Sequence, residues 1–168
     1  GDKLLYQDKK GYEDPWRKHH QSSITRDIWL CTLGREHSFQ KITSFKGEDR
    51  NPVWATDGSS FYYLSEEKGS FNIFKNDLTG RNSRQITNHT MHPVRFLTSD
   101  NNGNLCYGYD GEIYTVKEGT QPKKVDVQII SDKVENDLIH QLKASGATDI
   151  AVSPNGKEVA FIVRGDVY

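Results

Sequence analysis

The sequence has few cysteines, no long apolar run and no surplus of either charge. Cys31 and Cys106 stand far apart and outside any CxxC or Cys/His spacing, which favours structural thiols over a metal site, a disulfide or a reactive thiol. Apolar runs such as Val159 to Val163 are much shorter than the roughly 20 residues that span a bilayer. The 22 basic and 23 acidic side chains give a net charge of -1, which disfavours a polyanionic partner. We therefore expect no membrane span, no nucleic-acid partner and no metal or other cofactor.

An internal repeat is the main signal that the sequence does contain. The segment from Arg50 to Thr87 begins a pattern that returns from His92 to Val127, and the same order of elements precedes it and restarts at Asp149. Each unit has a short apolar strand, a turn, a second strand, a third strand that ends in an apolar pair, and a fourth strand. The third strand recurs at Ile28, Ile73, Ile113 and Val167. A repeated four-stranded unit of about 40 residues is typical of a β-propeller blade.

The turns between the first and second strands carry an Asx-Gly pair: Asp57-Gly58, Asn102-Gly103 and Asn155-Gly156. Both residues of such a pair tolerate the positive φ of a tight hairpin, so the flanking strands are expected to pair antiparallel. The aromatic residues in the strands are expected to form a core between blades rather than a stacking platform: Trp54, Tyr62, Tyr63, Phe71 and Phe74. The predicted fold class is all-β, a partial β-propeller of four-stranded antiparallel blades, with about three blades and the start of a second propeller.

Three stretches of the repeat resemble the propeller region of tricorn-type serine peptidases. They begin at Ile42 (ITSFKGEDRNPVWATDG), Phe61 (FYYLSEEKGSFNIFKNDLTGRNSRQIT) and Asp149 (DIAVSPNGKEVAFIV). The phrase TRDIW, from Thr25 to Trp29, is followed by two regular blades and an off-repeat segment, an order that favours tricorn over TolB-like and prolyl-oligopeptidase-like propellers. Tricorn proteins join a six-bladed propeller to a seven-bladed one, a PDZ-like module and a catalytic portion.

The resemblance implies a division of the chain into three parts. Residues 1–130 would be the C-terminal blades of a first, six-bladed-type propeller, and residues 147–168 the opening strands of a second. Between them, residues 131–146 (SDKVENDLIHQLKASG) are polar and do not match the repeat. We interpret them as a linker, with a long blade-to-blade connection as the alternative.

The stretch from Tyr12 to Arg26 is an insertion between the second and third strands of the first blade. Its serines lie in no nucleophile elbow, and adjacent histidines in an extended chain point apart, so catalysis and metal binding are disfavoured. Two interpretations remain: a solvated surface loop, or a loop that binds a peptide carboxylate, acidic side chains or a neighbouring peptidase domain. The candidate contact residues are Arg17, Lys18, His19, His20 and Arg26. A second charged group, from Glu48 to Arg50, is interpreted as a cluster that closes a turn.

The leading hypothesis for function is a non-catalytic propeller segment of a tricorn-like protease, which scaffolds the peptidase and gates or guides peptides. A propeller surrounds an axial channel whose width and rim charge can select substrates. In the tricorn family the catalytic serine and histidine belong to the C-terminal portion, so the resemblance assigns no catalytic residue to this chain and makes its parent a serine peptidase.

The expected partners are peptides and the parent's own peptidase domain, and open blades also predict self-association. A TolB-like propeller that binds a protein and has no peptidase is the alternative, and a prolyl-oligopeptidase-type enzyme is a third possibility. The cysteines leave the compartment open, while the resemblance favours an exported or periplasmic location over a cytoplasmic one.

Overall fold

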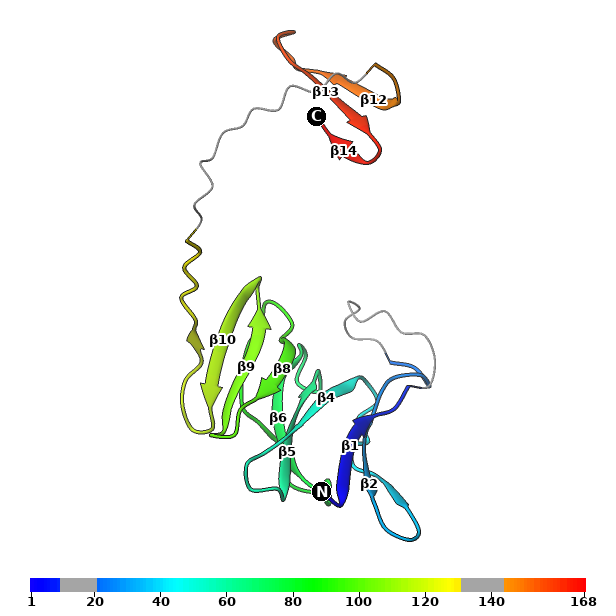
Figure 1. The fold of residues 1–168 in the computed structure, drawn as a ribbon, viewed down its shortest axis with the longest axis vertical. Helices are drawn as coiled ribbons and strands as arrows, with labels where there is room; N and C mark the ends of the chain where they lie inside the picture. Colours follow the sequence, from blue (N-terminus) through cyan, green and yellow to red (C-terminus); the bar gives the residue numbers. More distant parts are fainter. Residues whose placement is uncertain (10–20, 131–143) are drawn as a thin grey trace. The chain divides into compact units, whose positions relative to one another are not determined.

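The structure, a computed structural model, describes residues 1–9, 21–130 and 144–168. Within these ranges it contains strands, turns and loops and no helix (Figure 1). The chain divides into two compact units, Gly1–Val127 and Gln128–Tyr168. The predicted all-β class is confirmed. Whether the two units belong to two propellers stays a prediction, and most of the expected linker lies outside the described residues.

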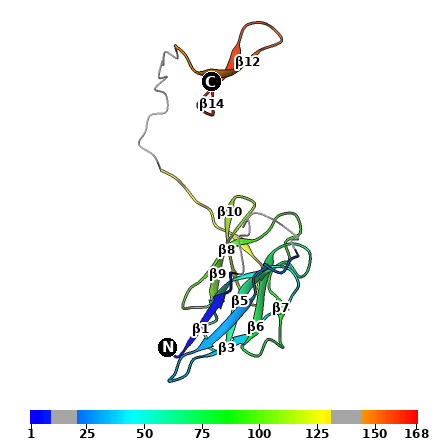
Figure 2. The ribbon, with the colours of Figure 1, turned by 90° about the vertical axis from the view of Figure 1, so that its right-hand side faces the viewer.

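The larger unit consists of three antiparallel sheets, in which each strand pairs with its neighbour along the chain. The first has three strands, β1 (Lys3–Gln7), β2 (Ile28–Thr32) and β3 (Ser38–Lys41). The second has four, β4 (Asp49–Trp54), β5 (Ser60–Ser65), β6 (Asn72–Asp77) and β7 (Arg84–Gln85). The third has β8 (Arg95–Ser99), β9 (Asn104–Tyr109), β10 (Glu112–Lys117) and β11 (Lys123–Lys124). We call these sheets the first, second and third blades, and Figure 2 gives a second view of them.

The smaller unit contains a single sheet of three antiparallel strands, β12 (Ala147–Val152), β13 (Val159–Val163) and β14 (Asp166–Val167). The predicted hairpin turns are present in both units. Gly58, Gly103 and Gly156 have φ of 64°, 80° and 66°, values that favour glycine. The Asp57 carboxylate also accepts hydrogen bonds from the backbone N–H groups of Ser59 and Ser60, which holds its turn closed.

The core of the larger unit lies between the blades, and the second blade is buried on both faces. Phe61 and Tyr63 of β5 pack with Ile28 of the first blade. The alternate residues, Tyr62 and Leu64, pack with residues of the third blade. All six residues of β5 are therefore buried, which explains why the strand reads as a nearly continuous apolar run. The predicted aromatic core is confirmed.

A β-bulge recurs in β4 and β8, the first strands of the second and third blades. The register with the next strand shifts between Arg50 and Val53 in β4, and between Arg95 and Thr98 in β8. Asn51 and Phe96 take positive φ values of 53° and 56° at these points. The bulges fix an equivalence between the second and third blades, in which Arg50 corresponds to Arg95.

One expectation about charge is wrong. Glu48, Asp49 and Arg50 do not close an exposed turn, because they lead into and begin β4, where all three are buried. The physical reason is that Arg26 of the first blade covers this point and forms an ion pair with Glu48.

The carboxylate of Glu118 joins the third blade to the second. Glu118, in the turn after β10, accepts hydrogen bonds from the Tyr62 hydroxyl at 3.0 Å and from Lys75 Nζ at 2.8 Å. It also forms an ion pair with Arg84. Because all three partners belong to the second blade, this network adds polar contacts to the apolar core between the blades.

Candidate functional site on the outer face of the third blade

The third blade buries one face and exposes the other. Its inward side chains, among them Leu105, Tyr107 and Val116, pack in the core shared with the second blade. The opposite face carries Phe96 and Ile113, which are 68% and 46% exposed. An apolar sheet face that no described sheet of this unit covers is a surface available for packing or binding.

This outer face lacks the bulk found at the same positions of the second blade. Leu64 pairs with Arg50 and Ile73, whereas Gly108 pairs with Arg95 and Ile113. Gly108 therefore occupies the place of Leu64. By the same register Cys106 stands in the place of Tyr62, and Gly111 in that of Phe71.

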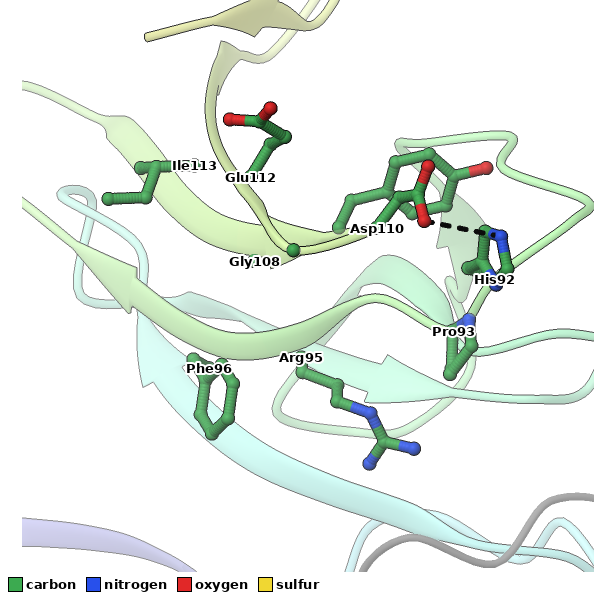
Figure 3. Close-up of a pocket in the computed structure, with 10 residues that line it drawn as sticks. His92, Pro93, Arg95, Phe96, Gly108, Asp110, Glu112 and Ile113 are labelled. Carbon is green, nitrogen blue, oxygen red and sulfur yellow. Dashed lines mark ion pairs between the residues drawn. The ribbon is translucent and has the colours of Figure 1, made fainter. Parts of the chain in front are cut away.

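The missing side chains leave a hollow of about 540 Å³ over Gly108 and Gly111, which we call the outer hollow. Figure 3 shows Arg95 and Phe96 on one strand and Ile113 on another, with Gly108 between them. A Cβ atom at Gly108 would lie 3.1 Å from the Phe96 ring. Glycine at this position therefore allows the ring to approach the floor of the hollow.

Charged groups stand at the rim of the outer hollow. His92 Nε2 lies 3.3 Å from Asp110 Oδ1, a pair that is ionic when the histidine is protonated (Figure 3). Glu112 is paired with Lys124 Nζ at 2.7 Å. The hollow thus has an apolar floor and a rim of mixed charge, as protein-binding surfaces do.

An aromatic cluster supports the wall of the outer hollow from behind. Tyr109 stacks on His89 with ring centroids 3.8 Å apart, and His89 Nε2 lies 2.9 Å from the Tyr107 hydroxyl oxygen. Burial lowers the pKa of His89 and raises that of Tyr107. The lowered pKa favours the neutral form of His89, which contacts Tyr109 by stacking and Tyr107 by a hydrogen bond.

The outer hollow has an apolar lining that suits contact with another molecule. Across the described ranges no group of three or more His, Cys, Asp or Glu side chains is placed to hold a metal ion. Nor does any helix in these ranges have the length and apolar character needed to cross a bilayer. The arrangement offers an apolar cavity with groups of both charge signs at its rim, supported by the aromatic cluster of His89 and the tyrosines.

Of the five predicted contact residues of the insertion, the structure describes one. Arg17, Lys18, His19 and His20 lie outside the described residues. Arg26 is described, and its guanidinium forms an ion pair with Glu48 while its backbone N–H donates to Glu48 Oε2 at 3.2 Å. Its side chain is only 11% exposed. The role of the five residues in peptide contact stays a prediction.

Sequence reasoning missed the outer hollow. Aligning the two blades by Ile73 and Ile113 places Gly111 against Phe71 but Gly108 against Lys68, and only the pairing of the second and third strands brings Gly108 to the place of Leu64. A glycine next to an aspartate reads first as a turn residue, and only the strand register shows that bulk is missing from a packing face.

Comparisons with known proteins support the architecture. No family model matches the chain. It is 25% identical over 163 residues to a tricorn protease homolog of Saccharolobus solfataricus, which covers 95% of this chain and 14% of that protein. It is 25% identical over 158 residues to the tricorn protease of Thermoplasma acidophilum, covering 94% of this chain and 14% of that protein.

Solved structures agree in fold. A crystal structure of the tricorn protease matches with a TM-score of 0.70 and 22% identity, over 98% of this chain and 15% of that one. A TolB structure from Agrobacterium tumefaciens matches with a TM-score of 0.60 and 15% identity, over 74% of this chain and 45% of that one. The resemblance to tricorn-type propellers and the propeller fold class are confirmed, for a chain that spans a small part of the curated relatives' length.

Proposed function

We propose that this chain is a non-catalytic propeller segment of a tricorn-like protease, and that it scaffolds the peptidase and guides peptide substrates toward it. The observation that carries the proposal is the similarity to tricorn proteases over 95% of the chain, within 14% of the length of the matched protein. Blades arranged about an axis can select peptides by channel width and rim charge without any chemistry of their own.

The packing of the blades supports the scaffolding part of this proposal. Two apolar cores and the Glu118 network hold the three blades of the larger unit together. The exposed apolar residues on the third blade suit a further packed element, which would extend the stack. A rigid stack keeps its rim residues in fixed positions, as guiding a substrate requires.

The similarity to TolB supports a second candidate function. In this case the propeller holds a protein partner and no peptidase is attached. The outer hollow, with its apolar floor and charged rim, is the surface that would receive such a partner.

Peptidase assays on the full-length protein that contains this chain test the proposal. Hydrolysis of a short chromogenic peptide reports on the peptidase alone, whereas hydrolysis of a long unfolded polypeptide also depends on guiding. Charge reversal at Arg17 and Lys18 is expected to slow cleavage of the long substrate about fivefold, as the loss of about 1 kcal/mol of charge attraction would. Cleavage of the short peptide is expected to stay unchanged.

The matched control reverses the exposed charges of Arg81, in a loop, and Lys123, in β11, and should affect neither substrate. If no variant changes the cleavage rate of either substrate relative to the wild type, guiding by the insertion is refuted. A full-length protein without peptidase activity would refute the peptidase proposal and favour the TolB-like alternative.

A further inference from the structure

A second cavity lies between the first and second blades. It measures about 290 Å³, and we call it the Asp49 pocket after its most deeply buried acid. Phe45 and Tyr63 form its apolar walls, and the Tyr63 and Ser83 hydroxyl oxygens lie 3.0 Å apart within it. Glu67, which is exposed, completes the acidic lining. The pocket is separate from the outer hollow, with which it shares no lining residue.

Asp49 is only 1% exposed, and its Oδ1 atom has no hydrogen-bond partner among the described residues. A buried carboxylate oxygen without a donor is costly, so it points to a group that the protein alone does not supply. Burial raises the pKa of Asp49 to about 7, although hydrogen bonds from Ser65 and Thr43 oppose the shift. The carboxylate is thus poised to ionise when a cation approaches.

The repeat shows that packing does not require an acid here. Asp49 precedes Arg50 as Val94 precedes Arg95, and Arg50 and Arg95 are equivalent in register. Val94 is fully buried in the apolar core between the second and third blades. Asp49 therefore replaces an apolar core residue, and a departure of this kind from local rules is expected at functional sites.

The charges around Asp49 are unbalanced. Two other carboxylates face it and raise its pKa, Asp27 and Glu67. Asp27 is neutralised by Lys41 Nζ at 2.8 Å, but the lining of the Asp49 pocket includes no lysine, arginine or histidine. By contrast, the nearby Glu48 has Arg26 as its counter-ion. The pocket therefore contains acidic groups without a basic partner in its lining, and an external cation would stabilise the ionised form of Asp49.

We propose that the Asp49 pocket binds a primary ammonium group, with Asp49 as the buried counter-ion and Glu67 at the mouth. An ammonium donates three hydrogen bonds from a compact centre, and aromatic walls favour a cation. A divalent metal fits less well, because the described residues provide no cluster of three or more metal-binding side chains. The ligand can be the amino terminus of a peptide or a lysine side chain, and the peptide source rests on the proposed function.

Calorimetric titration of the 168-residue chain with three probes tests the proposal. Trialanine amide carries a free amino terminus, its N-acetylated form carries none, and Nα-acetyl-lysine amide carries only the side-chain amine. Binding of either amine, without binding of acetyl-trialanine amide, supports the ammonium site, and the two amines distinguish its source. Equal binding of the acetylated peptide, or no binding of either amine, would overturn the proposal.

Variants locate the site. Asp49→Asn keeps the shape of the side chain and should weaken amine binding at least tenfold, whereas Asp57→Asn, an acid in an exposed turn, should leave it unchanged. Unchanged binding by Asp49→Asn would also overturn the proposal, and circular dichroism shows whether the variant is folded.

For Nα-acetyl-lysine amide, affinity should fall about tenfold from pH 8 to pH 6 as Asp49 takes up its proton. A full-length protein without peptidase activity would leave these binding results intact.

Discussion

Replacement of Asp49 by asparagine should stabilise the protein, and more so at high pH. The pKa of Asp49 is about 7 in the folded protein against 3.8 for the ordinary carboxyl group. Between these values the folded state holds a proton that the unfolded state has lost, so the free energy of unfolding falls as pH rises from about 4 to 7. A shift of this size corresponds to about 4 kcal/mol.

The variant removes this titration because an amide does not ionise in this range. In the absence of amines, Asp49→Asn should be more stable than the wild type at pH 8 by a few kcal/mol, up to about 4, with the difference vanishing below about pH 4. Urea unfolding of the 168-residue chain, followed by circular dichroism at pH 4, 6 and 8, measures it. A constant difference across these pH values, or a less stable variant at pH 8, would refute the reasoning.

Asp57→Asn is the control with the opposite sign. Hydrogen bonds from Ser60 and Ser59 lower the pKa of Asp57 to about 2. The stability that this acid contributes is present above about pH 4 and is lost as pH falls through about 2. The control variant should therefore be less stable than the wild type at pH 6 and pH 8.

Three further predictions concern stability and exposure. Glu118→Gln weakens the charged contacts between the second and third blades, so it should lower the free energy of unfolding in urea by about 1–2 kcal/mol. An unchanged free energy of unfolding would show that the Glu118 network does not stabilise the protein. Gly80→Ala should lower the free energy of unfolding by about 3 kcal/mol or more in the same assay, because Gly80 has a positive φ and a Cβ there would meet the backbone carbonyl of Ile42. Gly58→Ala is the control: Gly58 also has a positive φ but faces open space, so the loss should be about 1 kcal/mol. Maleimide should label Cys106 in the folded protein and reach the buried Cys31 only after unfolding, as mass spectrometry of the labelled peptides would show.

Much of the fold could be predicted because the repeat can be recognised from short sequence patterns, a recurring isoleucine and the Asx-Gly turns. Ile28, Ile73 and Ile113 recur at one point of the third strand, and the structure places them in β2, β6 and β10. Turns such as Asp57-Gly58 require positive φ, which few other residue pairs tolerate. Strand order and pairing follow from these two signals alone.

Burial of charge could not be predicted in the same way. The run from Glu48 to Arg50 has the composition of an exposed turn, and its covering partner Arg26 lies in another blade. Whether an acid near a turn is solvated or enclosed depends on which blade stacks over it. The Asp49 pocket arises from such stacking of residues from two blades. The outer hollow lies within one blade, between His92 and Ile113, but it depends on how the strands pair and not on the order of the residues alone.

The outer hollow also bears on how blades recognise their neighbours. In the second blade, Tyr62 and Leu64 project into the adjoining sheet, whereas the third blade presents Cys106 and Gly108 at those places. A sheet shaped to receive the second blade would leave empty space against the third, at a cost that grows with the volume left unfilled. A face with bulky side chains and a face with small ones therefore favour neighbours of different shape, so the size of a few side chains constrains which sheet can pack against which blade.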